Sequence, residues 1–133
     1  MKQHGAVLTD TKAFPSFSVD DIDKARRFYH DTLGVAVEER REGLELDIGD
    51  GHRVLVYPKP DHTPATYTIL NFQVDDVDEA VDRLTSDGVI FERYDLPGIK
   101  TDARGIARNG RTPTMAWFRD PAGNIMSVIR QQS

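Results

Sequence analysis

Two short clusters of aspartate are the residues of this chain whose type and spacing most directly suggest chemistry. Residues 19–25 (VDDIDKA) return almost unchanged as residues 74–80 (VDDVDEA), so each cluster holds three aspartates within four positions. Such a group could bind a cation or exchange protons with a substrate. Helix capping explains the clusters better, because each one precedes an amphipathic stretch whose first N–H groups need acceptors. We therefore expect Asp20 and Asp75 to cap two helices.

The histidines and the one serine considered as a nucleophile show no catalytic or metal-binding pattern. His4 lies near the N-terminus, His30 on the polar side of the first predicted helix, His52 in a predicted turn and His62 in a proline-rich segment. No two of them have the i, i+4 or short strand spacing of a metal site, so each is expected at the solvated surface. Ser127 has no base near it in the sequence, which argues against a serine nucleophile at this position.

Composition excludes several classes of partner. The 133 residues carry a net charge of −5, with acidic and basic residues interspersed, which argues against nucleic acid as a partner. The chain has no cysteine, which excludes disulfides and thiolate metal sites and agrees with a reducing compartment. No apolar run approaches the length of a membrane span. We expect a cytoplasmic protein with no membrane partner.

The repeat predicts a molecule made of two similar halves. Apolar side chains recur at helical spacing in residues 21–33, and residues 77–84 repeat that pattern. Gly34 and Gly88 follow where a helix C-terminal glycine is expected. Short runs with strand character surround the helices, at residues 14–19, 35–41, 44–48, 53–57, 68–74, 89–94, 114–119 and 125–130.

These patterns predict one domain over residues 1–133. Module one is expected at about 12–58, a linker at 59–66 and module two at about 67–131. Prolines in and beside the linker should make it a stiff connector rather than a flexible tether.

Residues 96–113 form a long stretch without periodicity that carries Lys100, Arg104, Arg108 and Arg111. A loop of this length is either a lid over a ligand or a solvated excursion. The basic residues favour a lid that meets an anionic group.

The order of these motifs resembles the vicinal oxygen chelate superfamily of glyoxalases, bleomycin-resistance proteins and extradiol dioxygenases. The most specific segments are FYHDTLGV at residues 28–35 and FRDPAGN at residues 118–124, and the resemblance extends from about residue 14 to residue 130. It implies an α+β fold in which two βαβββ modules form a curled mixed sheet around a concave cavity.

In metal-dependent members of this superfamily, four strand residues that face the cavity hold a metal, which acts as a Lewis acid on the substrate. The matching positions here are Phe14, Leu55, Ile69 and Ser127. The first three offer no lone pair to a cation, and serine is a poor ligand beside histidine and carboxylate. The resemblance therefore implies that the usual metal site is lost, and we expect no metal and no other cofactor.

Strand alternation extends these four positions to a cavity wall. Residues two or four positions away along the same strands face inward as well, whereas Phe17, Phe72 and Met126 should face the helices. An aromatic wall should come from Trp117 or Phe118, depending on a strand register that the sequence leaves open. The predicted ligand site comprises Phe14, Ser16, Arg53, Leu55, Tyr57, Ile69, Asn71, Gln73, Trp117 and Ser127.

Three functions are compatible with this site. The favoured one is metal-free binding of a small, partly apolar molecule in the concave pocket, as in the bleomycin-resistance proteins. The alternative is a metal-dependent or acid–base lyase, isomerase or dioxygenase; Arg53 and Tyr57 are its best candidates, and neither is a natural general base at neutral pH. A third is a regulatory or accessory module that acts through a protein partner. A homodimer is expected, because a sheet edge stays open and many relatives cover it with a second copy.

Overall fold

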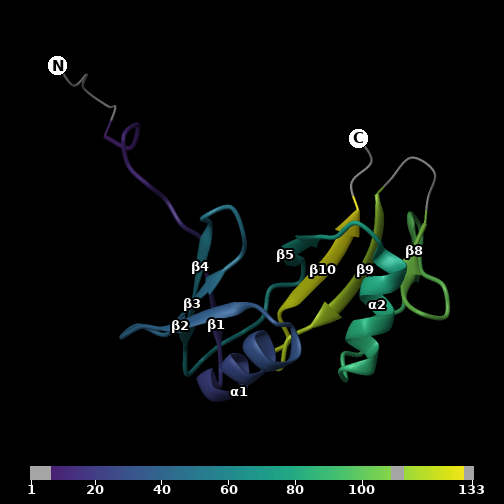
Figure 1. Ribbon diagram of the computed structural model, residues 1–133, viewed down its shortest axis with the longest axis horizontal. Helices are drawn as coiled ribbons and strands as arrows, with labels where there is room; N and C mark the ends of the chain where they lie inside the picture. The colour runs from purple at the N-terminus through teal and green to yellow at the C-terminus, as the bar shows by residue number, and fades with distance from the viewer. Residues whose placement is uncertain (1–6, 109–112, 131–133) are drawn as a thin grey trace.

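The computed structural model describes residues 7–108 and 113–130, which form an α+β fold of two modules lying side by side (Figure 1). Module one contains β1 (Ser16–Val19), α1 (Ile22–Arg26) with the π-helical segment η1 (Arg27–Thr32), β2 (Ala36–Glu39), β3 (Leu44–Asp47) and β4 (Arg53–Pro58). Module two contains β5 (Thr68–Gln73), α2 (Val77–Ser86), β6 (Asp95–Leu96), β7 (Ile99–Lys100), β8 (Ile106–Ala107), β9 (Thr114–Arg119) and β10 (Ile125–Arg130). Within the described ranges, no helix is both long and apolar enough to cross a membrane.

Each module builds a four-stranded mixed sheet, in the orders β1-β4-β3-β2 and β5-β10-β9-β8. In both sheets the first strand runs parallel to its neighbour, β1 beside β4 and β5 beside β10, and the remaining pairs are antiparallel. Strands β6 and β7 form a separate hairpin. The repeat in the sequence is therefore a repeat of topology, which confirms the predicted fold class.

The two helices begin one residue later than expected. Asp21 and Asp76 are the caps, and their side chains accept hydrogen bonds at 3.1 Å from the backbone N–H groups of Lys24 and Glu79. The expectation of Asp20 and Asp75 was wrong. The reason is that Ile22 and Val77 turn their side chains to the core and already belong to the first helical turn, so the cap must directly precede them.

One face of each sheet is apolar and lies under a helix. In the first sheet, Leu44, Leu46, Val54 and Val56 are buried in the core, and Ala116, Phe118, Met126 and Val128 are their counterparts in the second. Phe17 and Phe72 pack against the same core, as predicted for the helix-facing side. Ile69, predicted to face the cavity, packs against this core as well.

The two motif segments that carry the family resemblance meet in the interior. The hydroxyl of Tyr29 in η1 donates to Asp120 Oδ2 at 2.6 Å, and it lies 3.6 Å from Met126 Sδ. Burial, followed by the charge of Asp120, raises the pKa of Tyr29 far above its usual value, so the hydroxyl stays a donor. Asp120 also accepts from the backbone N–H groups of Ala122 and Asn124. This buried network joins module one to the β9–β10 hairpin.

The loop after β7 folds back onto α2. Arg104 donates to Asp78 Oδ1 at 2.8 Å and to Asp82 Oδ1 at 2.5 Å, and Arg108 pairs with Asp78 as well. These hydrogen bonds, with that of Arg108 the larger, lower the pKa of Asp78 to about 2. The idea that Arg104 and Arg108 belong to an anion-binding lid was wrong, because both form ion pairs with carboxylates on α2. Arg111 lies outside the described residues.

Candidate ligand site

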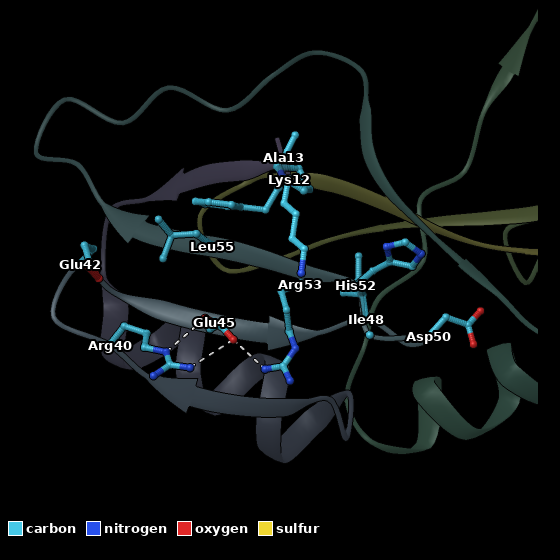
Figure 2. A pocket seen from close by; sticks show the side chains of 13 residues that line it. Lys12, Ala13, Arg40, Glu42, Glu45, Ile48, Asp50, His52, Arg53 and Leu55 are labelled. Atoms are coloured by element: carbon cyan, nitrogen blue, oxygen red, sulfur yellow. Dashed lines mark hydrogen bonds and ion pairs between the residues drawn. The ribbon is translucent and has the colours of Figure 1, made fainter. Parts of the chain in front are cut away.

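A broad hollow of about 990 Å³ lies on the face of the first sheet opposite α1 (Figure 2). Three residues of the predicted site, Phe14, Arg53 and Leu55, line it. Arg53 and Leu55 come from β4, which alternates between the core and the hollow, and Phe14 comes from the chain that leads into β1. Phe14 is 65% exposed, so its ring is available for contact with a ligand or a second protein copy.

A carboxylate held between two guanidinium groups forms the floor of this hollow (Figure 2). Glu45 Oε1 accepts from Arg53 Nη1 at 2.6 Å, and Glu45 Oε2 accepts from Arg40 Nε at 3.1 Å. The hydrogen bond from Arg40 is the largest cause that lowers the pKa of Glu45, so this carboxylate is charged at neutral pH. Sequence reasoning missed Glu45, although the alternation Leu44-Glu45-Leu46-Asp47 places it on the same face as Arg53.

The corresponding face of the second sheet carries three other predicted residues. Ser127 Oγ donates to Asn71 Oδ1 at 2.5 Å, and Trp117 is the direct β9 neighbour of Ser127. Phe118 lies on the opposite face in the core, so Trp117 is the aromatic residue of this surface. Its ring meets Tyr94 edge-on at a centroid distance of 5.5 Å. Tyr94 was missed. The strand expected at residues 89–94 is reduced to a bridge between Phe91 and Phe118 and a hydrogen bond from the Glu92 N–H to the Trp117 oxygen.

The remaining predicted residues lie between or beside the modules. Ser16, Tyr57 and Ile69 line a crevice of about 420 Å³ between β1 and β5, and Gln73 is exposed at the end of β5. The structure therefore distributes the ten residues over a hollow, a sheet face and a crevice. In the described chain β1 and β5 do not pair, and the hollow and the crevice are separate pockets that share only Pro15. Their joint role in ligand binding stays a prediction.

The four positions that hold a metal in some relatives do not fit a cation here. Phe14 and Leu55 lie in the hollow and Ile69 in the crevice, and each presents only carbon. Ser127 is fully buried and its hydroxyl is bonded to Asn71. Across residues 7–108 and 113–130, no group of three or more histidines or carboxylates is placed to hold a metal.

One histidine departs from its expected place. His62 is half-buried, with Nδ1 2.6 Å from Ser18 Oγ and Nε2 3.0 Å from the carbonyl oxygen of Ala122. The expectation of a solvated His62 was wrong, because the linker folds back onto the β9–β10 hairpin. His30 and His52 are exposed as expected, and His4 lies outside the described residues.

Two modules of this topology, each with one sheet face under a helix and one open face, define an α+β class of paired-module folds. The model of the glyoxalase/bleomycin resistance protein/dioxygenase superfamily matches residues 13–128. The chain belongs to this superfamily. A search of curated proteins found no significant match.

Solved structures agree with this assignment. An antibiotic-binding protein from Streptomyces sp. CB03234, TnmS3, is 26% identical with a TM-score of 0.62, over 92% of this chain and 98% of that one. A bleomycin-binding protein in complex with bleomycin is 23% identical with a TM-score of 0.65, over 92% and 99%. The fosfomycin resistance protein FosX from Listeria monocytogenes is 13% identical with a TM-score of 0.68, over 92% and 94%. The last two similarities show the fold alone.

Proposed function

We propose that this protein binds a small, partly apolar molecule in the hollow of its first sheet and holds it without a metal. The observation that carries this proposal is that the hollow combines a charged floor, Arg40–Glu45–Arg53, with the apolar side chains of Phe14 and Leu55. These two residues occupy positions that the resemblance assigns to metal ligands. A wall of this kind offers apolar contact and oriented polar groups, which is what small-molecule sites require. The antibiotic-binding and bleomycin-binding relatives support the same reading.

The charges around the hollow point to the chemistry of the ligand. Three cationic and three anionic side chains line it, Lys12, Arg40, Arg53, Glu42, Glu45 and Asp50. Because neither sign prevails, the site favours a molecule with several polar groups rather than a simple anion. Arg53 donates to Glu45 through Nη1. We assign the other N–H groups of its guanidinium to the ligand.

We further propose a homodimer in which a second copy closes the hollow with the Trp117 face of its second sheet. The β1 and β5 edges are unpaired toward each other in the described chain, and the segment with exposed Val7, Leu8 and Phe14 extends away from the body (Figure 1). Exposed edges and apolar segments of this kind are commonly buried against a partner. We also propose that residues 1–133 form one domain and that the protein is cytoplasmic.

Native mass spectrometry of protein purified from its source tests these claims together, because it reports bound ligand, bound metal and subunit number. We expect an organic ligand and no stoichiometric divalent metal. About one zinc, nickel, iron or manganese per chain after dialysis would contradict the metal-free proposal and favour the lyase, isomerase or dioxygenase alternative.

Ligand binding is measured through Trp117, the only tryptophan, with bleomycin as the first probe. Binding should change its fluorescence, because the Trp117 face of the second copy is proposed to close the hollow, and Arg53→Ala and Leu55→Ala should each weaken binding. Lys24→Ala is the control, because Lys24 is exposed on α1, on the opposite side of the first sheet. Equal weakening by all three variants would remove the site assignment.

A further inference from the structure

The crevice between the modules contains a serine and a histidine in hydrogen-bonding contact. The carbonyl of Ala122 can only accept a hydrogen bond, so in the neutral ring His62 Nε2 must carry the hydrogen that reaches it at 3.0 Å. Nδ1 is then the unprotonated nitrogen, and it accepts from the hydroxyl of Ser18 at 2.6 Å. A hydroxyl that donates to an imidazole oriented by a third group is the arrangement of an activated nucleophile.

The β9–β10 hairpin holds this histidine in place. The N–H groups of Ala122 and Gly123 donate to the Oδ1 and the backbone oxygen of Asp120 at 2.9 and 3.0 Å, which fixes the turn. Gly123 has φ +87°, and a Cβ there would lie 3.2 Å from Pro64 Cγ, so the linker packs closely on the turn. The position of the imidazole is thus set by the tertiary structure and not by a mobile surface loop.

One backbone donor, the N–H of Ser18, lies on the open edge of β1 beside the crevice. The N–H groups of Leu55 and Lys59 donate to the oxygens of Pro15 and Val19, so alternate residues of β1 bond to β4. Ser18 lies between them, and its backbone N–H therefore points to the open edge of β1, where its carbonyl oxygen accepts from Asn124 Nδ2 at 2.9 Å. A negative charge that develops on a carbonyl oxygen beside Ser18 Oγ would have this N–H as a donor, the role of an oxyanion hole.

The lining of the crevice defines the substrate class. The structure gives it a volume of about 420 Å³, and its lining residues include no lysine, arginine, aspartate or glutamate. Tyr57, Tyr67 and Ile69 supply apolar and aromatic surface. A charged substrate would lose solvation here without a partner, whereas an uncharged one would not.

We propose that Ser18 and His62 are a nucleophile and general base that cleave small uncharged esters in this crevice, apart from the ligand hollow. Ser18 Oγ attacks the ester carbonyl carbon while His62 Nδ1 takes the hydroxyl proton. The tetrahedral intermediate then expels the alcohol, which receives that proton from His62. Water, deprotonated by His62, attacks the acyl group on Ser18 and releases a carboxylic acid, and the proton returns to Ser18.

The test uses the full chain and two neutral probes, p-nitrophenyl acetate and an alkyl fluorophosphonate. We expect an initial burst of p-nitrophenolate and one phosphonyl adduct per chain, located at Ser18 by peptide mass spectrometry. Ser18→Ala should abolish both signals. His62→Gln should lower the labelling rate by about 100-fold or more, the usual contribution of a general base. Ser86→Ala is the matched control, because Ser86 is exposed at the end of α2 and does not line the crevice, and it should label like the original chain.

Circular dichroism and thermal unfolding of each variant confirm that the fold is intact before labelling is compared. A folded original chain that forms no adduct and no burst would overturn the proposal. Equal labelling of the original chain and Ser18→Ala would overturn it too. Neither outcome affects ligand binding in the hollow, which the Trp117 titration measures separately.

Discussion

At the scale of single residues, the contact between Tyr29 and Asp120 shows what the two family-specific motifs do. FYHDTLGV supplies the tyrosine and FRDPAGN the aspartate, and their side chains meet across the module boundary at 2.6 Å. Both side chains are buried away from water. Their hydrogen bond takes the place of the bonds to water that each group makes in the unfolded chain. The two motifs thus contribute a buried hydrogen bond that joins the modules.

Tyr29→Phe should destabilise the protein by about 1–3 kcal/mol, because the buried Asp120 carboxylate loses a donor while it stays desolvated. Urea unfolding followed by circular dichroism measures the free energy of unfolding. Tyr67→Phe is the control, since Tyr67 is 69% exposed and its change should be small. Similar unfolding midpoints for the two variants would show that the Tyr29–Asp120 bond contributes little.

Glu45 should titrate below the ordinary glutamate value of 4.5, because Arg40 and Arg53 stabilise its charged form. The carboxylate is expected to stay ionised as the pH falls through that value. Side-chain NMR titration measures the pKa directly. Arg40→Ala should raise it more than Arg53→Ala, since the hydrogen bond from Arg40 is the largest contribution. The reverse order would mean that Arg53 stabilises the charged form of Glu45 more than Arg40 does.

At the scale of elements, ion pairs hold the segment from Thr101 to Arg108 against α2. The guanidinium groups of Arg104 and Arg108 converge on Asp78, and Ile106 and Ala107 are buried as β8 beside β9. The arginines therefore dock the edge strand of the second sheet onto its helix.

Asp78→Asn should loosen this docking. The backbone amides of Ile106 and Ala107 should exchange hydrogen faster in the variant than in the original chain, whereas Asp75→Asn, just before the helix, should leave them unchanged. The folded pKa of Asp78 is about 2, against a usual 3.8. The stabilisation it provides is therefore present above about pH 4 and is lost as the pH falls toward 2. Unchanged exchange of these amides in Asp78→Asn would show that the ion pairs are not needed for the docking.

At the scale of the whole molecule, the open faces of the two sheets and the unpaired β1 and β5 edges favour a dimer. Sedimentation at micromolar concentration should give a species of twice the 15.0 kDa chain mass. A single 15 kDa species under these conditions would remove the shared-site proposal, while leaving the Ser18–His62 proposal to its own test.

Local sequence patterns were enough to predict the two-module fold, because strand alternation and helical periodicity are properties of neighbouring residues. The two motif segments were enough to predict the family. The helix caps were predicted one residue early, an error at the boundary where such patterns are weakest. Side chains such as Phe17, Phe72 and Met126 were assigned correctly, because an apolar face must be covered and a helix was the nearest cover.

The pairings that give the molecule its candidate sites join residues far apart in the chain. Ser18 meets His62 across the linker, and Ser127 meets Asn71 across two strands. Arg53 binds Glu45 because β3 and β4 are neighbours in a defined register, which turn lengths alone do not specify. Each of these contacts follows from how modules and loops pack, and the free energy of that packing comes from many distant groups at once. For this reason the sequence predicted the alternation of the strands but not which side chains touch.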